Sequence, residues 1–237
     1  MFRRRCLCTF SHQKFLVGNK PKKLIVFLHG YNSCIEDLLP YANILEKELN
    51  DVIIAIPMAD LVCERNNLKK QWFGLNDIDP TRKRRNTETS IDEIIEIYNN
   101  TGDLISNVSK KINSFVSALQ KEYKIKNKDT YIIGFSQGAM IAIYAGLSRR
   151  YKVGGIFSLA GIISGKDMLD KELSSRPNVY LFHGTSDVCV QYKTLNFTKK
   201  WLDNHKVYWE AFEYDGIDHR ITNEEINEVV KIIKKEI

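Results

Sequence analysis

Residues 131–140 read Tyr-Ile-Ile-Gly-Phe-Ser-Gln-Gly-Ala-Met, and this stretch decides the fold. It begins as a short apolar strand, and a helical pattern starts at Gln137. Ser136 lies between the two, with Gly134 two positions before it and Gly138 two positions after. This spacing forms a sharp strand-to-helix turn that exposes a serine hydroxyl. By composition alone such a match occurs in roughly one chain in twelve of this length, so the remaining sequence has to corroborate it.

Continuous apolar runs recur along the chain, as expected for strands that are buried on both faces of a parallel sheet. They lie at 24–28, 52–56, 131–133, 156–159 and 179–182, with a further extended run at 207–212. Stretches with a helical period alternate with them at 36–49, 90–98, 103–123, 137–147 and 190–202, and a last helix follows Thr222. Because parallel strands need crossover connections, this order predicts an α/β three-layer sandwich with a mostly parallel central sheet, as one domain over 1–237. Residues 61–89 interrupt this alternation of strands and helices and are expected to form a long functional loop.

The charge of the chain is mildly basic, with a net charge of +6. Basic clusters lie at 3–5, 20–23 and 82–85. No zinc spacing, helix-turn-helix or RNP-like motif accompanies them, which argues against nucleic-acid binding. We therefore expect each cluster to be a solvated face, with peripheral contact to anionic lipid headgroups as the next interpretation.

The five cysteines are odd in number and irregularly spaced, so a disulfide framework is not expected and a reducing compartment fits best. The apolar run after the N-terminal arginines is too short for a signal peptide. No later run approaches the roughly 20 apolar residues of a membrane span. These features predict a cytoplasmic protein without a transmembrane segment.

A serine hydroxyl becomes a strong nucleophile when a base takes its proton and a carboxylate orients that base. In sheets of this kind the three groups follow the order Ser, Asp or Glu, His. Asp187 lies in the loop after the fifth apolar run, and His219 lies between the last extended run and the last helix. Both positions fall just past strand ends, where open α/β sheets carry their ligands. Ser136, Asp187 and His219 are therefore the candidate triad, with Asp215 and Asp218 as alternative acids.

Acyl transfer also needs backbone donors for the negative oxygen of the tetrahedral intermediate. The N–H of Gln137 follows the nucleophile and is the first candidate. Tyr31 comes directly after the Leu-His-Gly turn that ends the first strong strand, and its N–H is the second. Cys63 and Cys189 are alternative nucleophiles, but neither occupies a tight strand-to-helix turn.

Taken together, these motifs resemble the phospholipase/carboxylesterase family of α/β-hydrolases, which includes the acyl-protein thioesterases. The resemblance is carried by LHG at 28–30, QWF at 71–73, GFSQGA at 134–139, HG-x-x-D at 183–187 and G-x-x-H at 216–219. It implies a nucleophilic Ser136 with Asp187 and His219 as partners, oxyanion donors at Tyr31 and Gln137, and no metal or cofactor. Trp72 matches the tryptophan of the loop that borders the family's acyl pocket. Trp72 and Phe73 are accordingly substrate-binding candidates, with simple packing of the loop as the alternative.

The chain departs from the family at several positions near the candidate site. Val188 and Gln191 stand where prolines are common, and Tyr31-Asn32 replaces a smaller pair. Residues 76–102 are longer and more charged than the corresponding family region. These differences leave the triad intact but change the shape expected for the acyl pocket.

The resemblance implies a serine hydrolase that cleaves carboxylic esters or thioesters through an acyl-serine intermediate. Short esters, lysophospholipids and acylated proteins are all compatible substrates, and the sequence predicts no oligomeric state. A peptidase is disfavoured because no added propeller or cap domain is evident. The alternative from another class is a non-catalytic scaffold that binds an acyl ligand or a partner.

Overall fold

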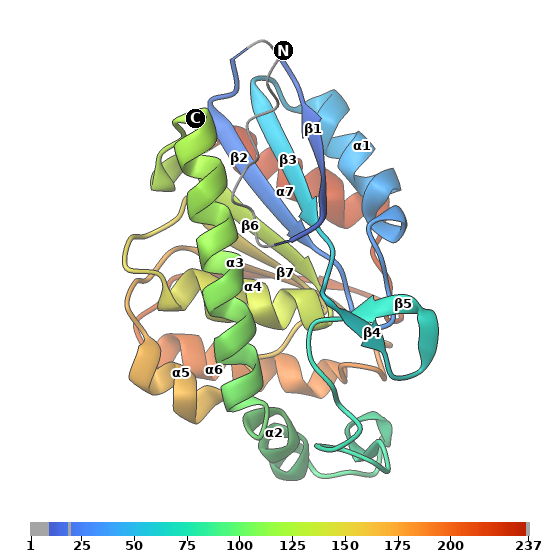
Figure 1. Cartoon of the computed structure of the whole chain (residues 1–237). Helices are drawn as coiled ribbons and strands as arrows, with labels where there is room; N and C mark the ends of the chain where they lie inside the picture. Colours follow the sequence, from blue (N-terminus) through green and yellow to red (C-terminus); the bar gives the residue numbers. More distant parts are fainter. Residues whose placement is uncertain (1–9, 19, 236–237) are drawn as a thin grey trace.

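The computed structural model describes residues 10–18 and 20–235. The basic cluster at 3–5 and the cysteines at 6 and 8 lie outside these described residues. Within them, the central sheet has seven strands in the order β1-β3-β2-β6-β7-β8-β9 (Figure 1). The strands are β1 (His12–Leu16), β2 (Lys23–Leu28), β3 (Val52–Pro57), β6 (Thr130–Phe135), β7 (Gly155–Leu159), β8 (Val179–Gly184) and β9 (Trp209–Tyr214). All neighbours pair in parallel except β1 and β3, which confirms the predicted mostly parallel sheet.

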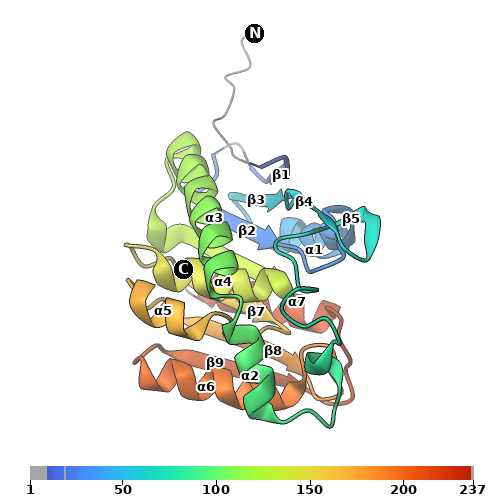
Figure 2. The same ribbon diagram turned by 60° about the horizontal axis from the view of Figure 1, so that its bottom comes forward.

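Helices cover both faces of the sheet and complete the three layers (Figures 1 and 2). One face carries α1 (Leu39–Glu48) and α7 (Asn223–Lys235). The other face carries α2 (Ile91–Asn99), α3 (Gly102–Tyr123), α4 (Gln137–Ser148), α5 (Lys166–Glu172) and α6 (Leu195–Asn204). The short α5 has no clear signal in the sequence and was not predicted. The predicted helix at 36–49 starts as a 3-10 turn and becomes α-helical at Leu39, because Pro40 fits only the first turn of an α-helix.

The starts of α2 and α7 follow from local hydrogen bonds that the sequence indicates. The Ser90 hydroxyl accepts from the Glu93 N–H at 3.2 Å and caps α2. The Thr222 hydroxyl accepts from the Glu225 N–H at 3.2 Å, and the Glu225 carboxylate accepts the Thr222 N–H at 2.7 Å. This second arrangement is a complete capping box ahead of α7.

Two apolar cores lie on the two sides of the sheet, which explains why the strands are apolar without alternation. In β2, Leu24, Val26 and Leu28 face the core under α3 and α4, whereas Ile25 and Phe27 face the core under α1 and α7. All five are fully buried. Complete burial of one such side chain contributes about 1.5–3 kcal/mol, so both faces of the strand stabilise the fold.

Two elements differ from the sequence-based expectation. The polar β1 is an edge strand whose side chains are mostly exposed, so it lacks the apolar signal of the inner strands. The expected loop at 61–89 is partly wrong, since it contains a hairpin of β4 (Leu61–Cys63) and β5 (Asn66–Gln71) and a 3-10 turn at Lys83–Arg85. This hairpin pairs with itself outside the main sheet and lies beyond the carboxyl ends of β2 and β3 (Figure 1).

Candidate active site

Ser136 occupies the sharp turn between β6 and α4. Its backbone has φ 54° and ψ −118°, a conformation that an L-residue adopts only under constraint. The turn is held because the Ser136 N–H donates to the Leu159 carbonyl at 2.9 Å and the Ser136 carbonyl accepts from the Ala139 N–H at 2.9 Å. The strained backbone presents the hydroxyl at the carboxyl edge of the sheet.

The two glycines of the motif are required by close backbone approaches. A Cβ on Gly134 would lie 2.2 Å from the Gly138 carbonyl oxygen. A Cβ on Gly138 would lie 2.3 Å from the carbonyl oxygen of Leu28, at the end of β2. Since both contacts are with backbone, no side-chain movement relieves them. The motif therefore packs the turn directly against the neighbouring strand.

The structure brings the three predicted triad residues into one hydrogen-bonded row. His219 Nε2 lies 2.8 Å from Ser136 Oγ, and His219 Nδ1 lies 2.7 Å from Asp187 Oδ2. Asp187 follows β8 and His219 follows β9, so the two side chains lie at the carboxyl ends of adjacent strands. With the proton on Nδ1 donated to the carboxylate, Nε2 is free to accept the serine proton.

The surroundings of Asp187 stabilise its ionised form. The residue is 3% exposed, and its Oδ1 accepts the N–H groups of Cys189 at 2.8 Å and Val190 at 3.1 Å. Burial opposes ionisation, but hydrogen bonding to His183 and His219 outweighs it and lowers the pKa of Asp187 to about 2. The carboxylate therefore stays negative throughout the neutral range.

The alternative acids are engaged elsewhere. Asp215 accepts a hydrogen bond from the Thr185 hydroxyl at 3.0 Å, and Asp218 pairs with the Arg220 guanidinium at 3.1 Å. Asp187 is thus the carboxylate that the fold sets against His219.

The two predicted oxyanion donors flank Ser136. Gln137 is the first residue of α4, where a backbone N–H has no partner within the helix. A Cβ built on Gly30 would lie 3.4 Å from Ser136 Cβ, which puts the turn leading to Tyr31 beside Ser136. Within the described residues, the N–H groups of Tyr31 and Gln137 donate to no other protein group. Both are available to an incoming ligand.

His29 organises the loop before Tyr31. Its Nδ1 lies 2.8 Å from the Gly30 carbonyl oxygen, its Nε2 accepts from the Ala59 N–H at 3.1 Å, and its ring stacks on Trp72. Burial lowers the pKa of His29 to about 4, so this histidine is neutral at physiological pH. Its role in the structure is to shape the turn.

A small cavity of about 20 Å³ opens at Ser136, with room for about one water molecule. Besides the predicted residues, its lining includes Leu75, Arg84, Arg85, Tyr98, Met140, Cys189 and Val190. The expectation that the 82–85 cluster is a solvated face is wrong for Arg84, because that residue is 6% exposed and pairs with a buried carboxylate. The unusual length and charge of residues 76–102 is the sequence signal that could have indicated that this segment lines the cavity at Ser136.

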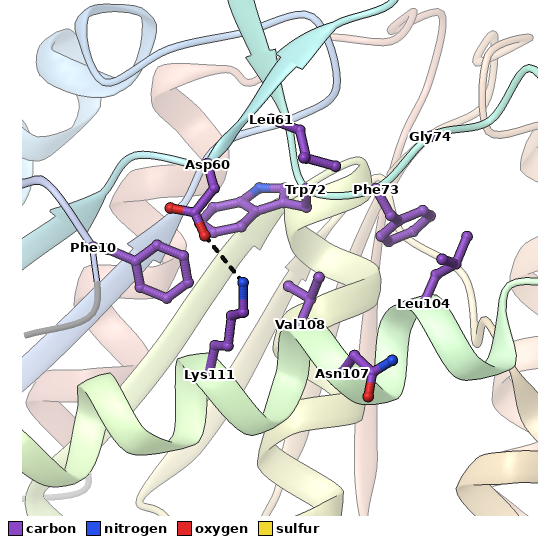
Figure 3. Close-up of a pocket in the computed structure, with 10 residues that line it drawn as sticks. All are labelled: Phe10, Asp60, Leu61, Trp72, Phe73, Gly74, Leu104, Asn107, Val108 and Lys111. Carbon is purple, nitrogen blue, oxygen red and sulfur yellow. Dashed lines mark hydrogen bonds and ion pairs between the residues drawn. The ribbon is translucent and has the colours of Figure 1, made fainter.

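Trp72 and Phe73 lie at a different cavity from Ser136. Both are buried and line a pocket of about 190 Å³ (Figure 3). Its other lining residues are Phe10, Asp60, Leu61, Gly74, Leu104, Asn107, Val108 and Lys111. The Gln137 side chain joins the two cavities, accepting from the Trp72 N–H and donating to the Phe73 carbonyl at 2.9 Å each. The short segment 72–75 is therefore the wall between the pocket and the serine.

The cysteines do not replace the serine in this geometry. Cys63 is buried in the β4–β5 hairpin, and burial raises the pKa of the Cys189 thiol, which disfavours a thiolate there. Cys34, Cys63 and Cys189 are free thiols. Among residues 10–18 and 20–235, no group of three or more His, Cys, Asp or Glu side chains is placed to hold a metal ion. Over the same residues, no helix has the length and apolarity needed to cross a bilayer.

A family model described as Phospholipase/Carboxylesterase matches residues 16–237. The chain belongs to the phospholipase/carboxylesterase family. This confirms the resemblance inferred from the motifs and identifies the chain as a serine-type carboxylic ester hydrolase.

Two distant relatives cover nearly the whole chain. Acyl-protein thioesterase 1 of Candida albicans is 21% identical and spans 92% of this chain and 93% of the relative. Acyl-protein thioesterase 1 of Mycosarcoma maydis is 24% identical, with 93% of each chain covered.

Solved structures share the fold of this phospholipase/carboxylesterase chain. The esterase PE8 superimposes with a TM-score of 0.82 at 23% identity, over 96% of this chain and 99% of its own. A Bacillus cereus carboxylesterase gives a TM-score of 0.71 at 18% identity, over 98% of this chain and 96% of its own. These similarities confirm the α/β-hydrolase architecture.

Proposed function

We propose that the protein hydrolyses carboxylic esters or thioesters through an acyl-enzyme formed on Ser136. The observation that carries the proposal is the row from Asp187 through His219 to Ser136, with contacts of 2.7 and 2.8 Å. The strained turn and the free N–H groups beside the serine support the same assignment.

The first half of the reaction forms the acyl-enzyme. His219 Nε2 takes the hydroxyl proton as Ser136 Oγ attacks the carbonyl carbon. Asp187 keeps the ring oriented and stabilises the imidazolium that results. His219 then gives the proton to the departing alcohol or thiol. In the second half, His219 activates a water molecule in the same way, and the acid product leaves.

The negative oxygen of each tetrahedral intermediate would accept hydrogen bonds from the N–H groups of Tyr31 and Gln137. The N-terminus of α4 adds positive potential at the same place. One such donor typically contributes about 10²- to 10³-fold in rate. Gln137 is well suited to this role because its side chain is already held by the backbone of Trp72 and Phe73.

We propose that the substrates carry an acyl chain, as in lysophospholipids or acylated proteins. The relatives named acyl-protein thioesterase support this substrate class. Trp72 and Phe73 would bind the chain in the neighbouring apolar pocket. Its volume of about 190 Å³ exceeds the roughly 150 Å³ of an apolar cavity that accepts benzene. We place this activity in the cytoplasm, which agrees with the free thiols of Cys34, Cys63 and Cys189.

A fluorophosphonate labelling experiment tests the catalytic assignment. The intact protein should gain one covalent adduct, which peptide mapping should locate at Ser136. Ser136→Ala should gain none, and His219→Ala should label much more slowly. An unlabelled wild-type protein that also fails to hydrolyse 4-nitrophenyl butyrate would refute the proposal.

The acyl pocket is tested separately by filling it. Val108 is partly buried in its wall (Figure 3), so Val108→Trp should obstruct the pocket and lower turnover of C8–C12 4-nitrophenyl esters relative to C2–C4 esters. Val108→Ala is the matched control at the same position. A chain-length profile that is identical in both variants would exclude this pocket from substrate binding.

A further inference from the structure

The cavity at Ser136 has two arginines on its wall, and their surroundings differ. Arg84 and Arg85 both come from the 3-10 turn at Lys83–Arg85. Arg84 Nη1 lies 2.6 Å from Asp79 Oδ2, and both side chains are almost completely buried. The charge of Arg84 is therefore already neutralised within the protein.

Arg85 has no such partner. Within residues 10–18 and 20–235, no carboxylate lies within ion-pair distance of its guanidinium. Its Nε is buried and has no hydrogen-bond acceptor. Because buried donors are nearly always paired, an unpaired one at the wall of an active site indicates that a ligand supplies the acceptor.

Neither Asp187 nor Asp79 pairs with Arg85, because the oxygens of both carboxylates are committed to other groups. Asp187 uses one carboxylate oxygen for two backbone N–H groups and the other for His219. Asp79 is held by Arg84. Among the residues that line the cavity, Arg85 is thus the guanidinium whose donors are not committed to a carboxylate, in partly dry surroundings where electrostatic attraction is stronger than in water.

The arginine turn is fixed relative to the triad. Gln191 Nε2 donates to the carbonyls of Arg84 at 2.9 Å and Asn86 at 2.8 Å. Lys193 Nζ donates to the carbonyls of Thr87 at 3.0 Å and Thr89 at 2.7 Å. Both donors belong to the segment that follows Asp187, so the same loop positions the catalytic acid and the arginine. Gln191 is one of the departures from the family pattern, and this clamp gives it a physical role.

We infer that Arg85 selects substrates that carry an anionic group, a carboxylate or a phosphate, close to the scissile carbonyl. The inference rests on the proposed function. A guanidinium binds such groups through paired, charge-assisted hydrogen bonds. Arg85 and Ser136 line the same small cavity, so the anion has to lie near the reacting carbon. Both the acyl part and the leaving group can carry such an anion, and the experiment separates the two cases.

The test compares substrates that differ in one anionic group. For the acyl part, the pair is 4-nitrophenyl hydrogen adipate and neutral 4-nitrophenyl hexanoate. For the leaving group, the pair is 1-hexanoylglycerol 3-phosphate and 1-hexanoylglycerol. The measured quantity is the ratio of kcat/KM within each pair, because a general structural defect lowers both members together.

We expect the wild-type protein to prefer the anionic member of at least one pair. Arg85→Gln should lower that ratio by about 10- to 100-fold, the effect of losing a hydrogen bond between charged groups. Arg85→Lys should recover part of it, since lysine keeps the charge but not the paired geometry. Arg82→Gln is the matched control, because Arg82 is exposed in the same turn and does not line the cavity. Equal ratios in wild type and Arg85→Gln would overturn the inference.

If the proposed hydrolase function is wrong, the same measurements give a different result. Neither member of a pair would then be hydrolysed, and Ser136 would take up no fluorophosphonate. Binding still tests the inference in that case, by calorimetric titration of monoethyl adipate and of 1-hexanoylglycerol 3-phosphate into Ser136→Ala and into Ser136→Ala with Arg85→Gln. Tighter binding of either ligand to the first protein supports the role of Arg85, and equal binding of both ligands refutes it.

Discussion

Replacement of Asp79 is expected to destabilise the fold severely. Its carboxylate pairs with Arg84 at 2.6 Å, with side-chain exposed fractions of 2% for Asp79 and 7% for Arg84. It also accepts the Lys83 N–H at 2.7 Å. Asp79→Ala leaves a buried guanidinium without its counter-charge, which costs about 3–5 kcal/mol in the free energy of unfolding. The nearby pair of Lys83 and Glu93 is 56% and 43% exposed, so Glu93→Ala should cost only about 0–1 kcal/mol.

Equilibrium unfolding in urea, followed by circular dichroism, measures both variants. If Asp79→Ala does not fold, Asp79→Asn retains an acceptor for the Lys83 N–H and gives a measurable intermediate loss. Asp79→Leu combined with Arg84→Met should recover part of the stability, because it removes the unpaired charge but still leaves the Lys83 and Arg84 N–H groups without their acceptor. A loss below 1 kcal/mol for Asp79→Ala, or a double variant as unstable as the single one, would refute this reasoning.

Three further perturbations test the site. Gly138→Ala should yield misfolded or inactive protein, because its Cβ would lie 2.3 Å from the Leu28 carbonyl oxygen; normal expression and fluorophosphonate labelling would contradict this. Asp187→Asn should keep the fold but lower kcat on the order of 10³–10⁴-fold, because the amide no longer holds His219 in the required tautomer; a loss under 10-fold would exclude Asp187 as the acid. Stability should fall as the pH drops from 6.5 to 4, because the pKa of His29 is lowered from 6.5 to about 4 and only the unfolded chain takes up the proton in this window. The shift amounts to about 3 kcal/mol, and a pH dependence of the unfolding free energy that is unchanged in His29→Gln would contradict it.

The inner part of the fold could be predicted because it leaves a strong pattern in the sequence. Strands buried on both faces are apolar at every position, and Leu24–Leu28 shows this fully. The edge strand β1 and the β5 strand are mostly exposed and polar, so no such pattern marks them. Their pairing depends on neighbours that are distant in the chain or on the hairpin turn, which local composition does not encode.

The candidate triad could also be anticipated, because each member follows a strand and strand order constrains where it lies. The placement of Arg84 and Arg85 at the cavity could not be anticipated. Arg84 and Arg85 look like part of an exposed basic run, and only the tertiary structure shows that one is buried against Asp79 and the other lines the cavity at Ser136 with an unpaired Nε. The same holds for Trp72, whose motif indicates a place near the site but not which cavity it lines.

By itself, the sequence determined the three-layer α/β sandwich and the tight turn at Ser136, together with the residues that meet there. The sandwich follows from local apolar periodicity. The turn follows from two glycines, Gly134 and Gly138, at positions where a side chain would clash with the backbone. The tertiary structure alone decided what surrounds the nucleophile. Which charge is neutralised, which donor stays unpaired and how large each cavity is depend on residues that lie far apart in the sequence. Gln191 and the carbonyl of Arg84, for example, are 107 positions apart. Such contacts form only when the sheet brings its strand ends together.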